Sequence, residues 1–385
     1  MDLKWFRVPR DIVFGQGTLE YLSKLDGTKA MLVTGGRSMR RLGFLDRATE
    51  YLESAGMAVE IVDGVEPNPS VQTVKRGAAA MRTFEPDLIV AIGGGSALDA
   101  AKIMWAFYEH PDLTFEEIIP VDSIPKLRTK ARFVAIPSTS GTASEITAFS
   151  VITDTERHIK YPIVSYEITP DVAILDPEVA AAMPPAVTAN TGMDVLTHAV
   201  EAFVSTSASS YTDPLALEAI KLVFENLRGA YENGSDMTAR ENMHNASTLA
   251  GMAFTNSSLG CVHSMAHKIG GRFNITHGLA NAILLPYVIE YNRDATPKYA
   301  EIEAALGIDD LAVAVQELNA QVGIATTLAD NGEVEITEAA FRDALQEMSQ
   351  NACEDPCTFT NPRETGCADL ADIYEAAYFG KLQEN

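Results

Sequence analysis

Short apolar runs alternate with amphipathic stretches over the first part of the chain. Five of these runs have the length of buried strands, and they cover residues 30–34, 58–62, 87–92, 132–136 and 172–175. Residues 38–55 and 71–83, between the early runs, repeat their apolar positions at helical spacing. Strands that alternate with helices are typical of a parallel sheet with crossover helices. The pattern therefore predicts an α/β, Rossmann-like fold here.

The pattern changes near residues 177–186, where Asp176-Pro177 and Pro184-Pro185 interrupt it. Beyond this region hardly any run resembles a strand. The clearest amphipathic helical stretches there are residues 213–231, 237–255, 297–306 and 310–322. We therefore predict an α/β domain over residues 1–180 and an all-helical domain over residues 181–385, with a cleft between them where a site is expected.

Composition narrows the range of partners. The chain has 385 residues, enough for two or three domains, and its 29 Lys and Arg against 53 Asp and Glu give a net charge of −24. This balance argues against nucleic acid or an anionic membrane as a partner, because both require a basic surface. The sequence has neither the apolar core of a signal peptide nor an apolar run near the ~18 residues of a membrane span. We therefore expect a cytoplasmic protein.

The cysteines leave two interpretations open. They are Cys261, Cys353, Cys357 and Cys367. The spacing of Cys353 and Cys357 is compatible with a metal knuckle. No second cysteine pair completes a zinc pattern, however, so reduced thiols of a cytoplasmic protein are the simpler interpretation.

A glycine-rich turn follows the strand predicted at residues 87–92. Gly93-Gly94-Gly95-Ser96 leads from this strand into a helix that begins near Ala97. Because glycine has no Cβ, the backbone N–H groups can approach a pyrophosphate closely, and the helix N-terminus adds partial positive charge. The spacing is not GxGxxG, so the standard dinucleotide fingerprint is absent, and a tight turn without a ligand would look the same.

A second polar cluster, PSTSGTASEIT at residues 137–147, also follows a predicted strand. In an open parallel sheet such clusters lie at the carboxyl ends of the strands, where ligands bind. Hydroxyl groups suited to a phosphate, ribose or nicotinamide amide belong to Ser138, Thr139, Ser140, Thr142, Ser144 and Thr147. An ordinary Ser/Thr loop would have the same composition.

Four of the seven histidines gather in and just after two helical motifs of the second half. In GMDVLTHAVEAFVS, Asp194 and His198 are four residues apart and therefore share one helical face. GCVHSMAHKIGG repeats this spacing with His263 and His267, and His277 follows. A carboxylate with several imidazoles suits Zn²⁺ or Fe²⁺ and leaves a coordination position for a substrate. Five candidates exceed a four-ligand site, so one of them is expected to have another role.

Together the blocks GGGSALDAAK, PSTSGTASEIT, GMDVLTHAVEAFVS and GCVHSMAHKIGGRFNITHGLANAILLP resemble, in this order, those of the iron-containing (group III) alcohol dehydrogenase family. The resemblance extends from RDIVFGQG at residues 10–17 to CTFTNPR at residues 357–363, and the histidine block is its most specific part. It implies a dehydroquinate synthase-like, two-domain architecture: an α/β dinucleotide-binding domain with a parallel sheet and an all-α metal-binding domain. It also implies a homodimer or a larger homo-oligomer.

The resemblance also implies roles for individual residues. The positions that match metal ligands are Asp194, His198, His263 and His277, whereas His267 matches a histidine beside the metal. Cofactor contacts are matched by Asn68, Gly94, Gly95, Ser96, Asp99, Ser138, Thr139, Thr142 and Lys160. The residues that resemble the lining of the substrate pocket are Phe149, Phe254 and Cys357.

One departure from the family concerns the cofactor. Members that prefer NAD commonly have an Asp after the strand predicted at residues 30–34, whereas this chain continues with GGRSMRR. A carboxylate there would repel a 2′-phosphate, and Gly36 leaves room for one. Ser38, Arg37 or Arg40 can then bind the phosphate, unless these arginines only decorate a helix start. We expect NADP(H) to be favoured over NAD(H).

The implied activity is reversible hydride transfer between a primary alcohol (or diol) or its aldehyde and nicotinamide C4. The divalent metal, Fe²⁺ with Zn²⁺ as the alternative, would act as a Lewis acid on the substrate oxygen, and His267 would relay a proton to solvent. A glycerol-dehydrogenase-like zinc oxidoreductase and a dehydroquinate-synthase-like lyase stay open on the same fold. In the lyase family the metal-site residues look like one Glu and two His, with additional basic residues that bind phosphate. This chain instead has Asp194 and four histidines. A non-catalytic nucleotide- or metal-binding protein is a further alternative.

Overall fold

The structure, a computed structural model, describes residues 5–157 and 159–382. It divides into two compact units. The α/β unit consists of Arg7–Thr139 and Ala143–Ala182, and the helical unit consists of Ser140–Thr142 with the described parts of Met1–Phe6 and Met183–Asn385. The division into domains at residues 180 and 181 stays a prediction.

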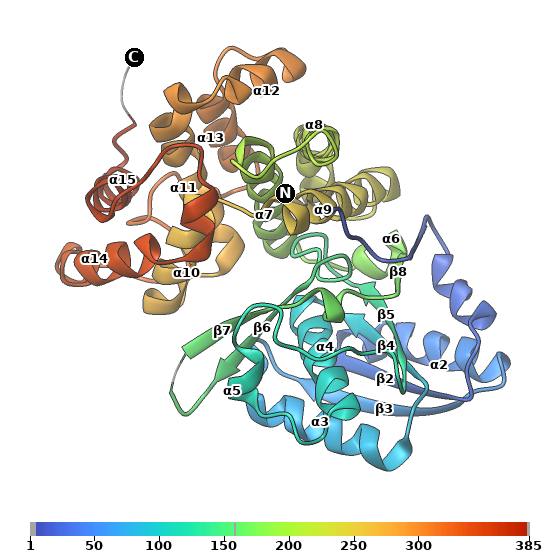
Figure 1. The fold of residues 1–385 in the computed structure, drawn as a ribbon. Helices are drawn as coiled ribbons and strands as arrows, with labels where there is room; N and C mark the ends of the chain where they lie inside the picture. Colours follow the sequence, from blue (N-terminus) through green and yellow to red (C-terminus); the bar gives the residue numbers. More distant parts are fainter. Residues whose placement is uncertain (1–4, 158, 383–385) are drawn as a thin grey trace. The chain divides into compact units, whose positions relative to one another are not determined.

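A six-stranded sheet forms the centre of the α/β unit (Figure 1). Its strands are β1 (Asp11–Phe14), β2 (Lys29–Gly35), β3 (Ala58–Val65), β4 (Leu88–Gly93), β5 (Arg132–Pro137) and β8 (Val172–Leu175). The order across the sheet is β1-β8-β5-β4-β2-β3, and every neighbouring pair is parallel. The predicted parallel α/β fold is therefore confirmed.

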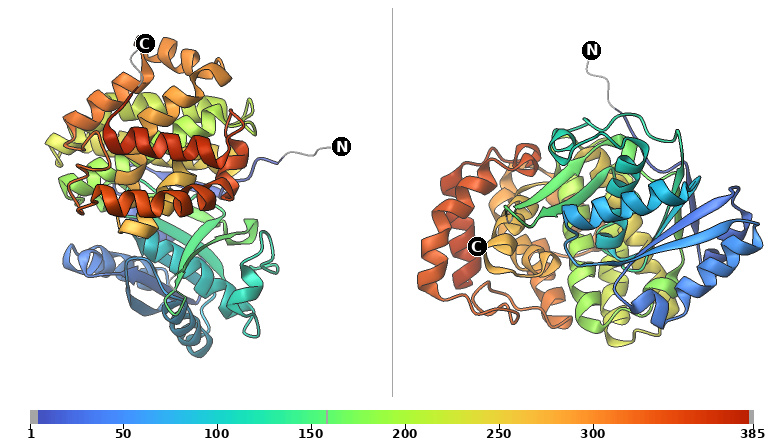
Figure 2. Two further views of the ribbon diagram at one scale, coloured as in Figure 1. Left: turned by 90° about the vertical axis from the view of Figure 1, so that its left-hand side faces the viewer. Right: turned by 90° about the horizontal axis from the view of Figure 1, so that it is seen from below.

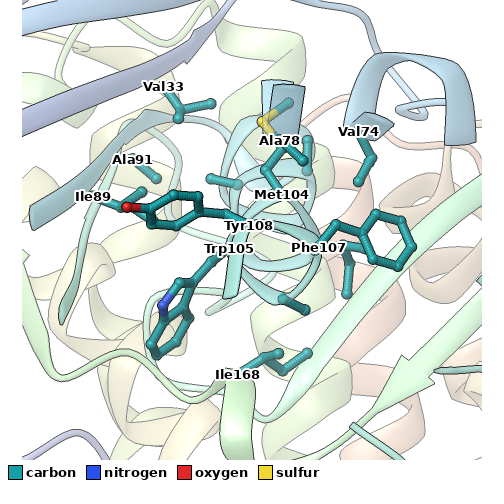
Figure 3. Close-up of a cluster of buried hydrophobic side chains, with 14 of the residues drawn as sticks. Val33, Val74, Ala78, Ile89, Ala91, Met104, Trp105, Phe107, Tyr108 and Ile168 are labelled. Atoms are coloured by element: carbon teal, nitrogen blue, oxygen red, sulfur yellow. The ribbon is translucent and has the colours of Figure 1, made fainter. Parts of the chain in front are cut away.

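Helical elements cover both faces of this sheet. They are η1 (Thr18–Lys24), α1 (Ser38–Arg41), α2 (Phe44–Ser54), α3 (Val71–Phe84), α4 (Gly95–Glu109), α5 (Phe115–Ile118), η2 (Tyr166–Ile168) and α6 (Pro177–Ala180). Met31 and Val33 of β2 belong to the core shared with α3 and α4, which includes Trp105 (Figure 3). Leu32, between them, belongs to the opposite core with η1 and α2. Alternate residues of one strand thus supply two cores, as a sheet covered on both faces requires.

One predicted helix is interrupted. The apolar pattern at residues 38–55 predicts a single helix, but α1 ends at Arg41 and α2 begins at Phe44. Between them Gly43 adopts a φ of +78°. Glycine enters this left-handed region at little cost, and a residue in this conformation ends a helix.

A hairpin in the α/β unit was not predicted. Strands β6 (Phe149–Asp154) and β7 (Ile159–Val164) form a separate antiparallel pair. Pro162 lies within β7, and a proline inside an apolar run argues against a central strand. In a two-stranded sheet each strand has one edge that is not paired within the sheet, and such an edge tolerates proline.

The helical unit is made of helices and connecting loops, with no strand among its described residues (Figure 2). Its helices are α7 (Pro185–Val204), α8 (Asp213–Glu232), α9 (Met237–Ser257), α10 (Cys261–Phe273), α11 (His277–Asn292), α12 (Lys298–Leu306), α13 (Leu311–Gln321), α14 (Glu338–Cys353) and α15 (Cys367–Phe379), with short η3 (Arg293–Ala295) and η4 (Pro356–Thr360). Most side chains of α7 and α11 are buried. The predicted all-helical half is confirmed. No helix in the described part of the chain combines the length and the apolar character needed to cross a membrane.

Candidate functional site

Helix α7 carries the first two predicted metal ligands. Asp194 and His198 lie one helical turn apart, and their side chains are almost fully buried. A buried carboxylate is costly unless neighbouring donors or cations replace its lost hydration. The face of α7 that carries both residues therefore needs partners from other helices.

Helices α10 and α11 supply these partners. His263 lies in the first turn of α10, and His277 is the first residue of α11. The start of α11 packs closely against α7, because a Cβ on Gly278 would lie only 2.2 Å from the backbone oxygen of Asn190. Glycine at this position lets the two helices approach and brings His277 to the ligand face of α7.

The predicted ligands converge on one oxygen atom. The Oδ1 atom of Asp194 lies 3.7 Å from Nε2 of His263 and 3.6 Å from Nε2 of His277. The ligand atoms of these three residues lie within 4.8 Å of one another. His198 adjoins this group: its Nδ1 atom is 4.0 Å from the same oxygen, and its ring stacks on His263 with centroids 4.4 Å apart. The structure thus brings all four residues together, three of them in a compact set.

Asn281 of α11 lies in the middle of this set. Its Nδ2 atom donates to Oδ1 of Asp194 at 2.7 Å, and it lies 3.2 Å from Nε2 of His263 and 3.1 Å from Nε2 of His277. An amide nitrogen has only two N–H bonds, so it cannot donate to all three of these atoms at once. The atoms that surround Asn281 therefore keep unused capacity to bind a cation.

Burial and charge oppose each other in this cluster. Burial by itself raises the pKa of Asp194, but the imidazoles around it hold the pKa of this carboxyl well below its ordinary value. Burial lowers the pKa of His198 to about 3, so its ring is neutral. Burial also lowers the pKa of His263, but the carboxylates of Glu201 and Asp194 outweigh it and raise the pKa to about 9. An ionised carboxylate in this position attracts a positive charge.

The donor set fits a divalent transition metal. One carboxylate oxygen and several imidazole nitrogens are ligands that both Zn²⁺ and Fe²⁺ accept. The Nδ1 atom of His198 is buried and has no hydrogen-bond partner among the described residues. Buried polar atoms without partners are rare, and a bound cation would account for the unpartnered Nδ1 atom of His198. The residues that would hold it are Asp194, His198, His263 and His277.

His267 is held by a different carboxylate. Its Nδ1 atom lies 3.2 Å from Oδ2 of Asp355, which also accepts from Nζ of Lys268 at 2.7 Å. Burial by itself raises the pKa of Asp355, but His267 and Lys268 hold it well below its ordinary value. The side chain of His267 is 38% exposed, whereas that of His263 is 1% exposed. Access to solvent and a separate carboxylate suit the predicted role of His267 in proton transfer.

The predicted pocket residues of the helical unit lie around these histidines. The ring of Phe254 stacks on that of His198 with centroids 4.4 Å apart. Cys357 lies in η4, and its thiol forms a group of potential ligand atoms with His267 and Asp355. Burial raises the pKa of this thiol, so it stays protonated. Cys353 belongs to neither group of potential metal ligands among the described residues, and the four cysteines form no disulfide.

In the α/β unit the glycine-rich turn lies at the point where the strand order reverses. From β2 the chain proceeds to β3 at one edge, and from β4 it proceeds through β5 toward the other edge. In open parallel sheets the carboxyl ends of the strands at such a point are where nucleotides bind. Strand β4 ends at Gly93, Gly94 is the N-cap, and α4 begins at Gly95. The backbone N–H groups of the first turn, including Ser96, are thus available to an anion.

The turn after β2 lies beside the turn after β4. A Cβ on Gly35 would lie 3.6 Å from the Cβ of Ala97 in α4. The next residue, Gly36, has a φ of +58° and open space around it, and Ser38 begins α1. The region in which the sequence predicts a 2′-phosphate site therefore adjoins the glycine-rich turn.

Two of the predicted hydroxyl residues lie at the same end of the sheet. The N–H of Ser138 donates to the backbone oxygen of Gly93 at 2.8 Å, and a Cβ on Gly94 would lie 3.5 Å from Cγ2 of Thr139. The other predicted cofactor residues come from further elements: Asn68 from the loop between β3 and α3, Lys160 from β7, and Thr142 from the segment that belongs to the helical unit. Burial lowers the pKa of Lys160.

Asp99, also predicted to contact the cofactor, already has partners within the α/β unit. Its carboxylate accepts from Oγ of Ser144 at 2.6 Å and from the N–H of Val151 at 2.9 Å. One turn further along α4, the buried Lys102 donates from Nζ to the backbone oxygen of Phe149 at 2.8 Å. These bonds tie the hairpin to α4, and they place Phe149, a predicted pocket residue, at its base.

Three residues of the site were not predicted from the sequence: Glu201, Asn281 and Asp355. Each of them hydrogen-bonds to a predicted site residue. Glu201 lies three positions after His198, and Asn281 lies four positions after His277, so helical spacing from the known candidates would have found both. Asp355 comes from a distant loop, and no local pattern connects it to the histidines.

These features define a class of protein in which one α/β unit carries a candidate nucleotide site and one helical unit carries a candidate metal cluster. Residues 9–177 match the family model of iron-containing alcohol dehydrogenases, and residues 188–378 match the C-terminal model of the same family. An NADPH-dependent butanol dehydrogenase of Clostridium saccharobutylicum is 52% identical over an alignment of 385 positions. The alignment covers 97% of this chain and 98% of that protein.

Two further similarities differ in extent. An aldehyde-alcohol dehydrogenase of Streptococcus pneumoniae serotype 2 is 44% identical over an alignment of 413 positions. The alignment covers 98% of this chain but only 46% of that longer protein. The structure of an iron-containing alcohol dehydrogenase of Thermococcus thioreducens superposes with a TM-score of 0.91 at 38% identity, covering 98% of this chain and 100% of that one. The chain therefore belongs to the iron-containing alcohol dehydrogenase family. The predicted family, fold class and alcohol dehydrogenase activity are confirmed.

Proposed function

We propose that this enzyme transfers hydride reversibly between a primary aliphatic alcohol, or its aldehyde, and NADP(H), with Fe²⁺ as the bound metal. The residues that would hold the metal are Asp194, His198, His263 and His277. The observation that carries the proposal is the buried Asp194 carboxylate, whose Oδ1 atom has three imidazole nitrogens 3.6, 3.7 and 4.0 Å away. The 52% identity to a protein named NADPH-dependent butanol dehydrogenase supports the choice of alcohol and cofactor.

The chemistry divides between the metal and the chain. A divalent metal supplies Lewis-acid polarisation of the substrate oxygen when it is bound. Asp194 contributes negative charge that offsets part of the charge of the ion. His267 moves the proton: Asp355 holds its Nδ1 atom at 3.2 Å, so Nε2 is the nitrogen that exchanges a proton between the substrate oxygen and solvent.

The glycine-rich turn binds the diphosphate of the cofactor in this proposal. Gly94 and Gly95 let the phosphates approach the backbone N–H groups at the start of α4. Gly36 leaves room for the 2′-phosphate, and Ser38, Arg37 or Arg40 binds it. Arg40 pairs with Asp63 at 3.3 Å, but both side chains are more than half exposed, and such a pair is weak enough to yield to a phosphate.

The decisive experiment is anaerobic NADPH oxidation with butanal. Protein stripped of metal is reloaded with Fe²⁺ or Zn²⁺, and NADH is assayed alongside. We expect turnover that requires metal, is fastest with Fe²⁺ and favours NADPH. Faster turnover with NADH would overturn the cofactor preference alone, and faster turnover with Zn²⁺ would overturn the metal alone. Absence of turnover despite bound metal would overturn the substrate class.

The role of His267 has its own test. His267→Ala should keep the metal but lose turnover by about 10²–10⁴-fold, the usual contribution of a proton-transfer group. His110→Ala is the matched control, because His110 lies in the α/β unit and bonds to the backbone oxygen of Lys126. Native turnover in His267→Ala would remove this residue from the mechanism.

We also propose a homodimer or larger homo-oligomer, which follows from the family resemblance, and a location in the cytoplasm, which agrees with the interpretation of the cysteines as reduced thiols. Sedimentation of the purified protein would measure its oligomeric state. A monomer at micromolar concentration would contradict the first part of this proposal.

A further inference from the structure

Glu201 lies on the Nδ1 side of His263, behind the candidate metal centre. It comes from α7, seven positions after Asp194, and 3% of its surface is exposed. Its Oε2 atom is 2.5 Å from Nδ1 of His263, and its Oε1 atom accepts the N–H of Val262 at 2.6 Å. Both oxygens of this carboxylate therefore bind the first turn of α10.

The two contacts determine which nitrogen of His263 carries a proton. The N–H of Val262 can only donate, and the partial positive charge at the start of α10 favours an ionised carboxylate there. An ionised carboxylate only accepts hydrogen bonds, so Nδ1 of His263 donates to Glu201. In the neutral ring the lone pair then belongs to Nε2, the nitrogen that lies 3.7 Å from Oδ1 of Asp194.

The residue before α10 leaves room for this carboxylate. Gly260 is the N-cap of α10 and has no side chain with which to cap it. A Cβ there would lie 2.8 Å from Oε1 of Glu201 and 3.2 Å from Oδ1 of Asn361. Glu201 therefore replaces a local cap, and a methyl group at position 260 would displace its carboxylate without changing its charge.

We propose that Glu201 is a positioning residue of the metal centre, holding His263 in the tautomer and ring orientation that aim Nε2 at the metal. The inference rests on the proposed function, because it requires metal bound by Asp194 and His263. Carboxylates that hold the outer nitrogen of a metal-binding histidine fix its orientation, and their loss costs about 10–100-fold in metal affinity.

Glu201→Gln tests the proposal in the apo protein. The amide has the shape of the carboxylate but offers one accepting oxygen and one donating NH₂ group, so it cannot accept from both Val262 and His263. When its oxygen takes the N–H of Val262, its NH₂ group faces Nδ1 and favours the tautomer with the proton on Nε2. We expect the affinity for Co²⁺, measured by competition with a chelator, to fall about 10–100-fold. The visible spectrum of Co²⁺ at saturation should also change, whereas the circular dichroism of the apo protein should not.

Asp176→Asn is the matched control. Asp176 is also fully buried, and its carboxylate accepts backbone N–H groups from Gly17 at 3.2 Å, Leu19 at 2.9 Å and Glu178 at 3.1 Å in the α/β unit. Its replacement removes the same charge from a similar capping position. We expect native affinity for Co²⁺ and a native Co²⁺ spectrum in this variant.

The outcomes separate the inference from the function on which it rests. Folded Glu201→Gln protein with native Co²⁺ affinity and spectrum would overturn the role of Glu201, and so would an equal loss of affinity in Asp176→Asn. Should Glu201→Gln fail to fold, Gly260→Ala decides: weakened Co²⁺ binding supports the proposal, and native binding overturns it. Equal binding by the native protein and Asp194→Asn would instead overturn the proposed metal centre.

Discussion

In the α/β unit the candidate cofactor site is built from backbone: Gly94 and Gly95 present the N–H groups at the start of α4 and carry no side chains that could block a ligand. In the helical unit the candidate metal site is built from side chains of three helices, with Asp194, His263 and His277 as its compact set. The first site depends on empty space, and a single added methyl group would change it. The second depends on the identity of its donor atoms, and replacing one carboxylate oxygen by an amide nitrogen would disrupt it.

Asp194→Asn tests the side-chain site and should have the largest effect. The amide keeps the size of the side chain but removes the negative charge that faces the imidazoles at 3.6 and 3.7 Å. We expect metal content to fall to background and turnover to fall by about 10³-fold or more, since several kcal/mol of charge stabilisation is lost with the metal. Metal analysis and steady-state assays measure both. Asp236→Asn, at the helix cap of α9, is the control, and full metal content in Asp194→Asn would refute the ligand set.

Gly94→Ala tests the backbone site. Gly94 has φ −72° and ψ 175°, which any residue can adopt, and a Cβ there would meet only the side chain of Thr139, with Cγ2 at 3.5 Å and Oγ1 at 3.8 Å, both ordinary contact distances. The fold therefore tolerates alanine. Unfolding measurements should show that the variant is as stable as the native enzyme or slightly more stable. We expect the KM for NADPH to rise about tenfold, which corresponds to about 1.4 kcal/mol. Metal content should not change. An unchanged KM would mean that the diphosphate does not approach this turn.

The sequence predicts these two sites to different depths. Glycines after a strand and histidines at helical spacing are local patterns, so the turn at residues 93–96 and the residues of the metal cluster were recognisable without coordinates. Gly43 and Pro162 show the limits for the fold, because a left-handed glycine inside an amphipathic stretch and a proline in a hairpin strand both depend on tertiary context. Asp355 shows the limit for the site, because it contacts a histidine 88 positions away and no local pattern connects the two residues.

The pair Gly36→Asp and Gly36→Asn sharpens the contrast, because it adds a side chain to the backbone site with and without charge. Gly36 has a φ of +58°, which Asn and Asp tolerate better than other side chains, and a Cβ there meets no heavy atom within 4 Å. Both variants therefore carry similar strain. We expect aspartate to lower the ratio of kcat/KM for NADPH over NADH by about tenfold, or about 1.4 kcal/mol, by repelling the 2′-phosphate. Asparagine should keep the native ratio more closely. Equal ratios in the two variants would contradict a 2′-phosphate site at this turn.

The smallest effect concerns a buried histidine of the helical unit that lies outside the metal cluster. His244 of α9 is 2% exposed, and its Nδ1 atom lies 2.9 Å from Oγ of Ser140. Burial lowers its pKa from 6.5 to about 4. The folded protein therefore keeps this ring neutral at a pH at which the unfolded chain takes up a proton. The resulting stability is present above pH 6.5 and is lost as the pH falls toward 4.

Between pH 6.5 and 5.5 this loss amounts to about 1 kcal/mol. His244→Gln removes the titrating group. Over this pH interval the Tm of the variant should therefore fall by about 2–4 °C less than the Tm of the native protein, for a unit of this size. Because the native protein and the variant share every other titrating group, the difference between their pH profiles isolates His244. Parallel pH profiles of the two proteins would show that the His244 ring is protonated in the folded protein, or that it is hydrated in both the folded and the unfolded state. A reduced slope would instead show that burial alone keeps an imidazole of this unit neutral, the condition in which His198 of the metal cluster can offer a lone pair.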